Sequence, residues 1–192
     1  MNAPIPEDSE EKRKCARKVV TRELPGCAGL FEEHQENLQT AVVGEPVFVE
    51  HLQRPQDSYY LVPVFSGFRQ PGEEPYFVAQ VAADNLKLLS IDSIEALQPD
   101  HEAWIYAVLN EDALEEKLKR SLHEYVPMSW ASTGRLAWKF CRQSFSPLKP
   151  FHVVTQGDSV AYVDIQGDLH TQLDLPRPVM PRENQDGKQM RG

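Results

Sequence analysis

The strongest structural signal in this sequence is the stretch Ser58-Tyr-Tyr-Leu-Val-Pro-Val-Phe65, followed after a polar loop by Tyr76-Phe-Val-Ala-Gln-Val-Ala-Ala-Asp-Asn-Leu-Lys-Leu-Leu-Ser-Ile-Asp92. β-Branched and aromatic residues fill both parts, which is typical of strands. The pair Asp84-Asn85 tolerates the positive φ of a tight turn and divides the second part. The stretch therefore predicts an antiparallel meander of three strands, over residues 59–65, 76–83 and 86–91.

Pro63 lies inside the first of these strands. Proline has no N–H to donate to a neighbouring strand, so within sheets it is found mainly in edge strands and at bulges. We therefore expect the strand over residues 59–65 to lie at an edge or a bulge. A peptide from a partner can add to such an edge as a further strand.

A second stretch with the same order of strands and turns runs from Phe151 to Asp174. Turns at Gly157-Asp158 and Gly167-Asp168 divide it into short strands. The alternating segment 135–140 precedes it and predicts a half-buried strand. The two similar stretches share turn residues and apolar strand residues but no reactive group, so they predict a repeated scaffold rather than a repeated function.

Apolar residues at spacings of three and four predict helices near residues 10–23, 28–40 and 101–124. Ser9 is placed to cap the first helix, and Leu24-Pro-Gly is expected to end it. We thus expect an α+β fold in which two antiparallel meanders pack against three or four helices, as one sheet or as two lobes. Four segments are expected: a disordered N-terminus over 1–8, a helix-helix-meander half over 9–98, a helix-meander half over 99–174, and a disordered tail over 175–192.

The composition excludes several classes of protein. The net charge of −9 over 192 residues argues against general nucleic-acid binding, which needs a basic surface. The sequence has no apolar run long enough to span a membrane, and its N-terminus lacks the basic and apolar regions of a signal peptide. Three cysteines, at positions 15, 27 and 141, form no Cys-x-x-Cys pair. These features predict a soluble cytoplasmic protein with reduced thiols that binds neither nucleic acid nor a membrane.

The segment Tyr162-Val-Asp-Ile-Gln-Gly-Asp-Leu169 resembles the strand-turn-strand ending of PepSY-type domains. The order of helices and meander from the N-terminus to Ile91 is similar to that of the same family. These domains are small α+β modules found in protease propeptides and regulatory proteins. The resemblance implies a binding or inhibitory module rather than a catalyst.

Aromatic side chains gather around the first hairpin: Tyr59, Tyr60, Phe65, Phe68, Tyr76 and Phe77. Neighbouring residues of a strand point to opposite faces, so these rings cannot all enter one core. Core on one strand face and cover on the other is one explanation. We expect Tyr59, Tyr60, Phe65, Phe68 and Tyr76 to form an exposed patch that binds another protein.

Two other classes of function remain open. Cys141 lies beside Arg142, with His152 further along the chain, and a thiolate nucleophile needs such a cation and base. Asp158 or Asp164 could orient the imidazole. A small buried residue at a strand end explains Cys141 as well. The third class is a small-ligand binder with a cleft between two lobes.

Motifs for metals, phosphates and nucleophilic serines are incomplete or missing. His152 and His170 fall in neighbouring predicted strands, and Asp168 or Cys141 could join them, but zinc needs at least three protein ligands. The hydroxyl residues of segment 129–133 lie in no Gly-x-Ser-x-Gly motif. We therefore expect no metal and no cofactor. The hypothesis is a non-catalytic accessory or regulatory module whose partner is another protein.

Overall fold

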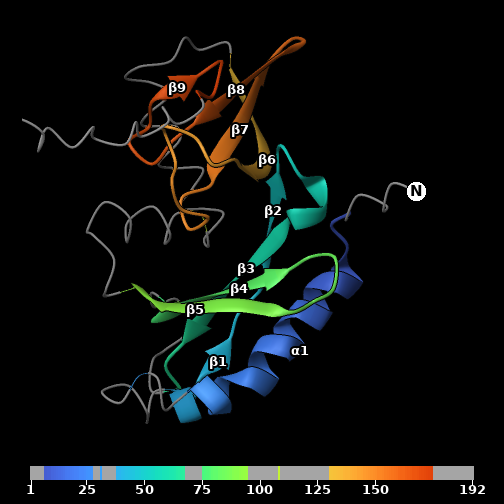
Figure 1. Ribbon diagram of the computed structural model, residues 1–192, viewed down its shortest axis with the longest axis vertical. Helices are drawn as coiled ribbons and strands as arrows, with labels where there is room; N and C mark the ends of the chain where they lie inside the picture. Colours follow the sequence, from blue (N-terminus) through green and yellow to red (C-terminus); the bar gives the residue numbers. More distant parts are fainter. Residues whose placement is uncertain are drawn as a thin grey trace, which may run out of the picture.

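The computed structural model describes residues 7–27, 31, 38–67, 75–94, 108 and 130–174. The elements with both ends in these residues are one α-helix, α1 (Glu10–Cys27), one short 3-10 helix, η3 (Pro55–Asp57), and nine strands (Figure 1). The strands are β1 (Val42–Val43), β2 (Val47–His51), β3 (Tyr59–Phe65), β4 (Phe77–Ala82), β5 (Leu88–Ser93), β6 (Ala131–Trp138), β7 (Phe151–Gln156), β8 (Ser159–Val163) and β9 (Leu169–His170).

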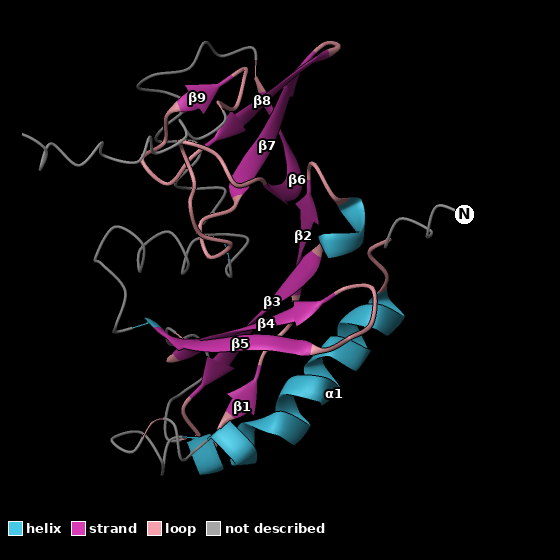
Figure 2. Ribbon diagram, viewed as in Figure 1, coloured by secondary structure: helices cyan, strands magenta, loops and turns pink. Residues whose placement is uncertain are grey.

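All of these strands belong to one sheet (Figure 2). Its order is β5-β4-β3-β2-β6-β7-β8-β9, and β1 pairs with β3. The described pairs are antiparallel except β2 with β6, which run parallel with Val49 opposite Leu136 and His51 opposite Trp138. This parallel ladder joins a first half, β1–β5, to a second half, β6–β9.

The inner strand β3 is buried on both faces. Tyr59 and Leu61 point into one hydrophobic cluster, the far-side core, which also contains residues of β2, β6, β7 and β8. Tyr60 and Val62 point into a second cluster on the opposite face, the α1-side core. A strand that is apolar at nearly every position is typical of a sheet covered on both sides. Alternate residues of β3 therefore contribute to two cores.

Helix α1 covers one face of the first half (Figures 1 and 2). Its buried residues Ala16, Val20 and Leu24 recur every four positions, which places them on one side of the helix. The Ser9 hydroxyl accepts the N–H of Lys12 at 3.3 Å, which is the expected N-terminal cap. The helix continues to Cys27, past the stop that the sequence predicts after residue 23.

The expected fold class is wrong. One large mixed sheet dominates the structure, with a single α-helix in the described residues, whereas antiparallel meanders against three or four helices were expected. The meanders form, as β3–β4–β5 and β7–β8–β9, but β2 and β6 lie between them and pair in parallel. That pairing joins segments that are distant in sequence, so no local pattern encodes it. Most of the helices expected at 28–40 and 101–124, the boundary at 98–99 and the tail at 175–192 lie outside the described residues.

Pro63 lies in an inner strand, so of the two expected positions, an edge or a bulge, the edge is wrong. Between the paired positions, residues 44–46 face only Val62 and Pro63, which is the irregularity of a bulge. β3 pairs with β4 on one side and with β1 and β2 on the other. The Pro63 carbonyl accepts the N–H of Gly44, in the turn between β1 and β2, at 2.8 Å. Because both main-chain groups of an extended residue point to the same side, the missing N–H of Pro63 faces that turn. The proline therefore interrupts no ladder.

The turn between β4 and β5 takes its positive φ at Leu86, at 55°, and not at the predicted Asp84-Asn85. The Asp84 side chain accepts the N–H of Asn85 at 2.7 Å, and the Asn85 side chain accepts the N–H of Lys87 at 2.9 Å. Local side-chain bonds of this kind substitute for a backbone turn. The residue with positive φ is Leu86, directly after the Asp84-Asn85 pair.

β6 contains a bulge at Gly134. The register between β6 and β7 shifts between Ser132 and Leu136, and Gly134 has a φ of +66°. The hydroxyls of Ser132 and Thr133 accept the N–H groups of Gly134 and Arg135, both at 3.2 Å. Side chains thus satisfy main-chain donors that the bulge removes from the ladder.

Candidate functional site

Two residues of the predicted aromatic patch lie in the core. Tyr59 and Tyr60 are 1% and 0% exposed, because both faces of β3 are covered. Phe65 and Tyr76 are partly exposed, and Phe68 lies outside the described residues. The expectation that Tyr59 and Tyr60 form part of an exposed patch is therefore wrong.

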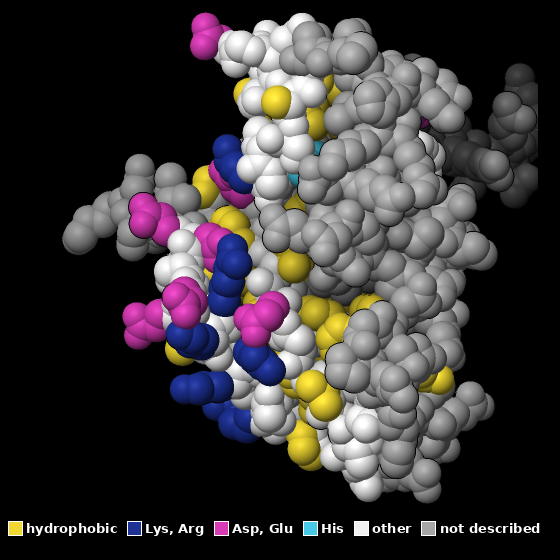
Figure 3. All heavy atoms as spheres, turned by 180° about the vertical axis from the view of Figure 1, so that it is seen from behind, with side chains coloured by type: hydrophobic (Ala, Val, Ile, Leu, Met, Phe, Trp, Pro, Cys, Tyr) yellow, Lys and Arg dark blue, Asp and Glu magenta, His cyan; other side chains and the backbone are white. Residues whose placement is uncertain are grey.

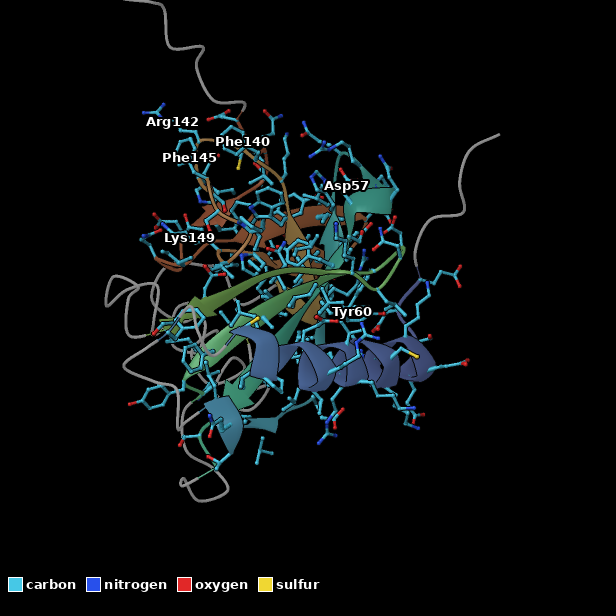
Figure 4. The ribbon with its side chains drawn as sticks, turned by 60° about the horizontal axis from the view of Figure 1, so that its bottom comes forward. Asp57, Tyr60, Phe140, Arg142, Phe145 and Lys149 are labelled. Carbon is cyan, nitrogen blue, oxygen red and sulfur yellow. The ribbon has the colours of Figure 1, made fainter. Side chains whose placement is uncertain are left out.

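A different aromatic pair is exposed. Phe140 and Phe145 are 47% and 60% exposed and contact each other edge to face, with ring centroids 5.6 Å apart. Both belong to the segment between β6 and β7, residues 139–150, which we term the aromatic loop (Figure 4). The other large exposed apolar residues of the described chain each lie on a separate strand: Val42, Leu89 and Val160. Single exposed apolar residues are normal, whereas a contacting aromatic pair is a candidate binding surface.

Side chains from the core hold the aromatic loop in place. Tyr59 Oη donates to the carbonyl of Pro147 at 2.6 Å, and burial raises the pKa of Tyr59, which keeps the hydroxyl protonated. Trp138 Nε1 donates to Ser144 Oγ at 3.1 Å, and this hydroxyl lies 2.8 Å from the carbonyl of Lys149. Tyr59 is therefore an anchor beneath the loop.

Main-chain bonds brace the same loop. Cys141 and Ser144 exchange two bonds, of 3.0 and 3.2 Å, so the phenylalanines flank a closed turn. The N–H of Arg142 donates to the carbonyl of Asp174 at 2.9 Å, and the N–H of Asp174 donates to Gln143 Oε1 at 3.3 Å. A loop that is ordered before binding loses less conformational entropy when a partner arrives.

The aromatic loop carries positive charge and no Asp or Glu: its charged residues are Lys139, Arg142 and Lys149. Lys139 Nζ donates to the carbonyl of Leu173 at 3.0 Å, and burial lowers the pKa of Lys149. Figure 4 shows Arg142 at the same end of the molecule as the phenylalanine pair. A positive rim therefore accompanies the exposed rings.

The side of α1 differs from this loop because several of its charges are paired. Its ion pairs in the described residues are Arg13–Asp8, Lys14–Glu10, Arg17–Glu45 and Arg22–Glu23. Figure 3 shows basic and acidic side chains interleaved on this side of the molecule. Solvent-exposed ion pairs of this kind contribute little to the free energy of unfolding.

The structure does not join Cys141 to His152. His152 Nε2 lies 2.8 Å from Ser132 Oγ, and Nδ1 has no hydrogen-bond partner among the described residues. Ser132 pairs with Val154, two residues beyond His152, so the imidazole is directed away from the end of β6 that Cys141 follows. Cys141 is fully buried. The thiol hypothesis therefore has no nucleophile–base contact here.

His152 is itself an inner residue. It is 1% exposed, and burial lowers its pKa to about 4. An imidazole with that pKa is uncharged at neutral pH and is a weak general base. Its contact with Ser132 therefore acts as a structural hydrogen bond beside the bulge at Gly134.

His152 and His170 do not share a face of the sheet. His152 pairs with Val163 and His170 with Tyr162, and adjacent residues of a strand point to opposite sides. His170 Nε2 instead lies 2.6 Å from the carboxylate of Asp164, which also accepts two main-chain N–H groups of the next turn. Within the described residues, no three His, Cys, Asp or Glu side chains gather to hold a metal.

A cavity of about 380 Å³ lies where the two halves of the sheet meet. Phe48 of β2 and Leu136 of β6 line it, together with two ion pairs: Arg13–Asp8 and Arg135–Glu50. This cavity is a cleft of the kind that the small-ligand hypothesis requires. Each guanidinium is already paired with a carboxylate of the protein, so neither is free to select the charge of a ligand.

No protein-family model, no curated protein and no solved structure matches this chain. The resemblance to PepSY-type domains therefore stays a prediction from residues 162–169 and from the order of elements. Across the described ranges, no helix combines the length and the apolar character that a membrane span requires.

The sequence pattern did not reveal the exposed pair. Alternation over residues 135–140 predicts a half-buried strand that includes Phe140, but β6 ends at Trp138. Phe145 lies in Ser144-Phe-Ser-Pro147, between Arg142 and Lys149 and outside any periodic element. An aromatic residue between cations in such a connector is the signal that could have identified the site.

Proposed function

We propose that this chain is a non-catalytic cytoplasmic protein-binding module that contacts its partner through Phe140 and Phe145. The proposal is carried by one observation, an exposed edge-to-face pair on a loop that is hydrogen-bonded to the core. Aromatic anchors contribute a large share of the energy of protein interfaces. The proposed site thus moves from the first hairpin to the aromatic loop, while the class of function is the one that the sequence predicts.

The rival classes have less support. The thiol-enzyme hypothesis needs a base near Cys141, and His152 contacts Ser132 instead. The small-ligand hypothesis has a cavity, but its guanidinium groups are paired within the protein. The resemblance to PepSY-type domains implies a binding or inhibitory role and agrees with the proposal.

Affinity capture with the full chain tests this function. We expect wild-type protein to retain a specific partner and the double variant F140S/F145S to lose it, with binding of the isolated partner weakened at least about tenfold. Serine removes both rings, and their exposure means that the core loses little packing. The readout is the partner identified by mass spectrometry, followed by its affinity for each purified variant.

The matched control is L89S/V160S, which removes two apolar side chains of similar exposure from β5 and β8. This control should bind as the wild type does, and circular dichroism should be alike for all three proteins. A partner that binds F140S/F145S with wild-type affinity contradicts the proposed site.

A further inference from the structure

Two of the cations in the aromatic loop, Arg142 and Lys149, have no ion-pair partner among the described residues. Arg142 alone, among the arginines of the described residues, forms no ion pair: Arg13, Arg17, Arg22, Arg54 and Arg135 each contact a carboxylate. Lys149 forms no ion pair with a described residue either, and burial lowers its pKa, which reflects an ammonium that has lost part of its hydration. Carboxylates of a bound partner would form ion pairs with both cations.

We infer that the surface formed by Phe140, Arg142, Phe145 and Lys149 binds an acidic segment of a partner protein that also carries an apolar side chain. This inference rests on the function proposed above and adds the chemistry of the partner. The apolar side chain packs against the two rings, and carboxylates of the same segment contact the guanidinium and the ammonium. Charged rims of this kind select partners and speed their association.

The chain's own tail does not have this chemistry. Residues 175–192 contain four bases and two acids, a net charge of +2, so the positive rim repels them. Nucleic acid offers negative charge and stackable bases, but the chain as a whole carries −9. In addition, the two phenylalanine rings stand at 74° to each other, which is not a stacking platform for successive bases. An acidic protein segment is the occupant that fits both features of the surface.

A random-peptide display library, selected on the immobilised full chain, provides the probes. We expect enriched peptides that combine several Asp or Glu residues with an aromatic or large aliphatic residue. Each peptide is then measured against wild type, F140S/F145S, R142Q/K149Q and the control L89S/V160S. The charge variant should weaken binding about tenfold, and so should raising the salt from about 0.05 M to about 0.5 M.

The outcomes separate this inference from the proposed function. Peptides that need both rings but show no acidic enrichment, or that bind R142Q/K149Q as tightly as wild type, overturn the inference and leave the proposed function standing. Binding that does not depend on the rings, or no enrichment at all, contradicts both. Ring-dependent binding of a labelled single-stranded oligonucleotide overturns the inference in favour of nucleic acid. Ring-dependent self-association in analytical ultracentrifugation overturns it in favour of a second copy of the chain.

Discussion

Burial in the sheet determines the pKa of His152. The side chain sits in β7 with Nε2 bonded to Ser132, and the pKa falls to about 4 because water cannot solvate the charged ring. In the unfolded chain the pKa is near 6.5. Between these two values the unfolded state binds more protons, so the free energy of unfolding falls as the pH is lowered through that window.

His152→Leu should remove this dependence. For the wild type we expect a loss of up to about 3 kcal/mol between about pH 7 and about pH 4 from this residue, and a correspondingly smaller loss in the variant. Chemical denaturation at several pH values gives the comparison. Ser132→Ala serves as control, because desolvation and not the hydroxyl lowers the pKa, so its pH dependence should match the wild type. An unchanged pH profile in His152→Leu would refute the assignment. His51, whose pKa burial also lowers, contributes with the same sign in all three proteins.

Residue identity predicted burial poorly in this chain, for a physical reason. An exposed patch that includes Tyr59 and Tyr60 was expected because adjacent residues of a strand face opposite sides of the sheet. That rule holds. The error was to assume that only one face of the sheet is covered. The unbroken apolar run of β3 is itself the signal of a strand with two covered faces. The exposure of Phe140 and Phe145, in contrast, depends on where β6 ends. Alternation of apolar and polar residues does not predict that end.

Individual elements were predicted better than their assembly. α1, the two meanders and the glycine turns follow from local chemistry, because capping, alternation and positive φ act over a few residues. The parallel pairing of β2 with β6 joins two segments that are distant in sequence and that both contribute to the far-side core. The bulge at Gly134 is likewise invisible to a period-two pattern, although the glycine itself marks it.

Two glycines make a matched test of how elements constrain the backbone. Gly134 has a φ of +66° with no neighbour within 4 Å of an added Cβ, so Gly134→Ala should destabilise by about 1 kcal/mol through backbone strain alone. Gly26 lies within α1 and has equally open surroundings, but its φ is not positive. Gly26→Ala should therefore be neutral or stabilising, by less than about 1 kcal/mol. Equal effects of the two substitutions in urea denaturation would contradict the bulge geometry.

The two cores lie on opposite faces of one layer, so the molecule should unfold as a unit. Val20 of α1 is fully buried in the α1-side core, whereas Trp130 and Trp138 pack against the far-side core. Val20→Ala should lower the free energy of unfolding by about 1–3 kcal/mol. We expect tryptophan fluorescence and far-ultraviolet circular dichroism to report the same shifted midpoint, because β3 and β4 contribute to both cores.

The control for that experiment is Val42→Ala, which shortens an exposed valine of β1 and should leave the midpoint close to the wild type. A circular dichroism midpoint that falls while the tryptophan midpoint stays in place would show that the halves unfold independently. In that case the chain would behave as two lobes that merely touch at β2 and β6.

The parallel ladder between β2 and β6 also has a consequence during biosynthesis. Ala131 leaves the ribosome roughly 80 residues after His51, which at ~5–20 residues per second is a delay of about 4 to 16 s. By the end of that interval the nascent chain has had time to form β1 to β5, while one edge of β2 still lacks its partner strand. The edge is short, five residues, and carries Glu50, features that discourage pairing with a neighbouring nascent chain. Translation speed across residues 52–130 thus sets how long this protein is exposed to misassembly.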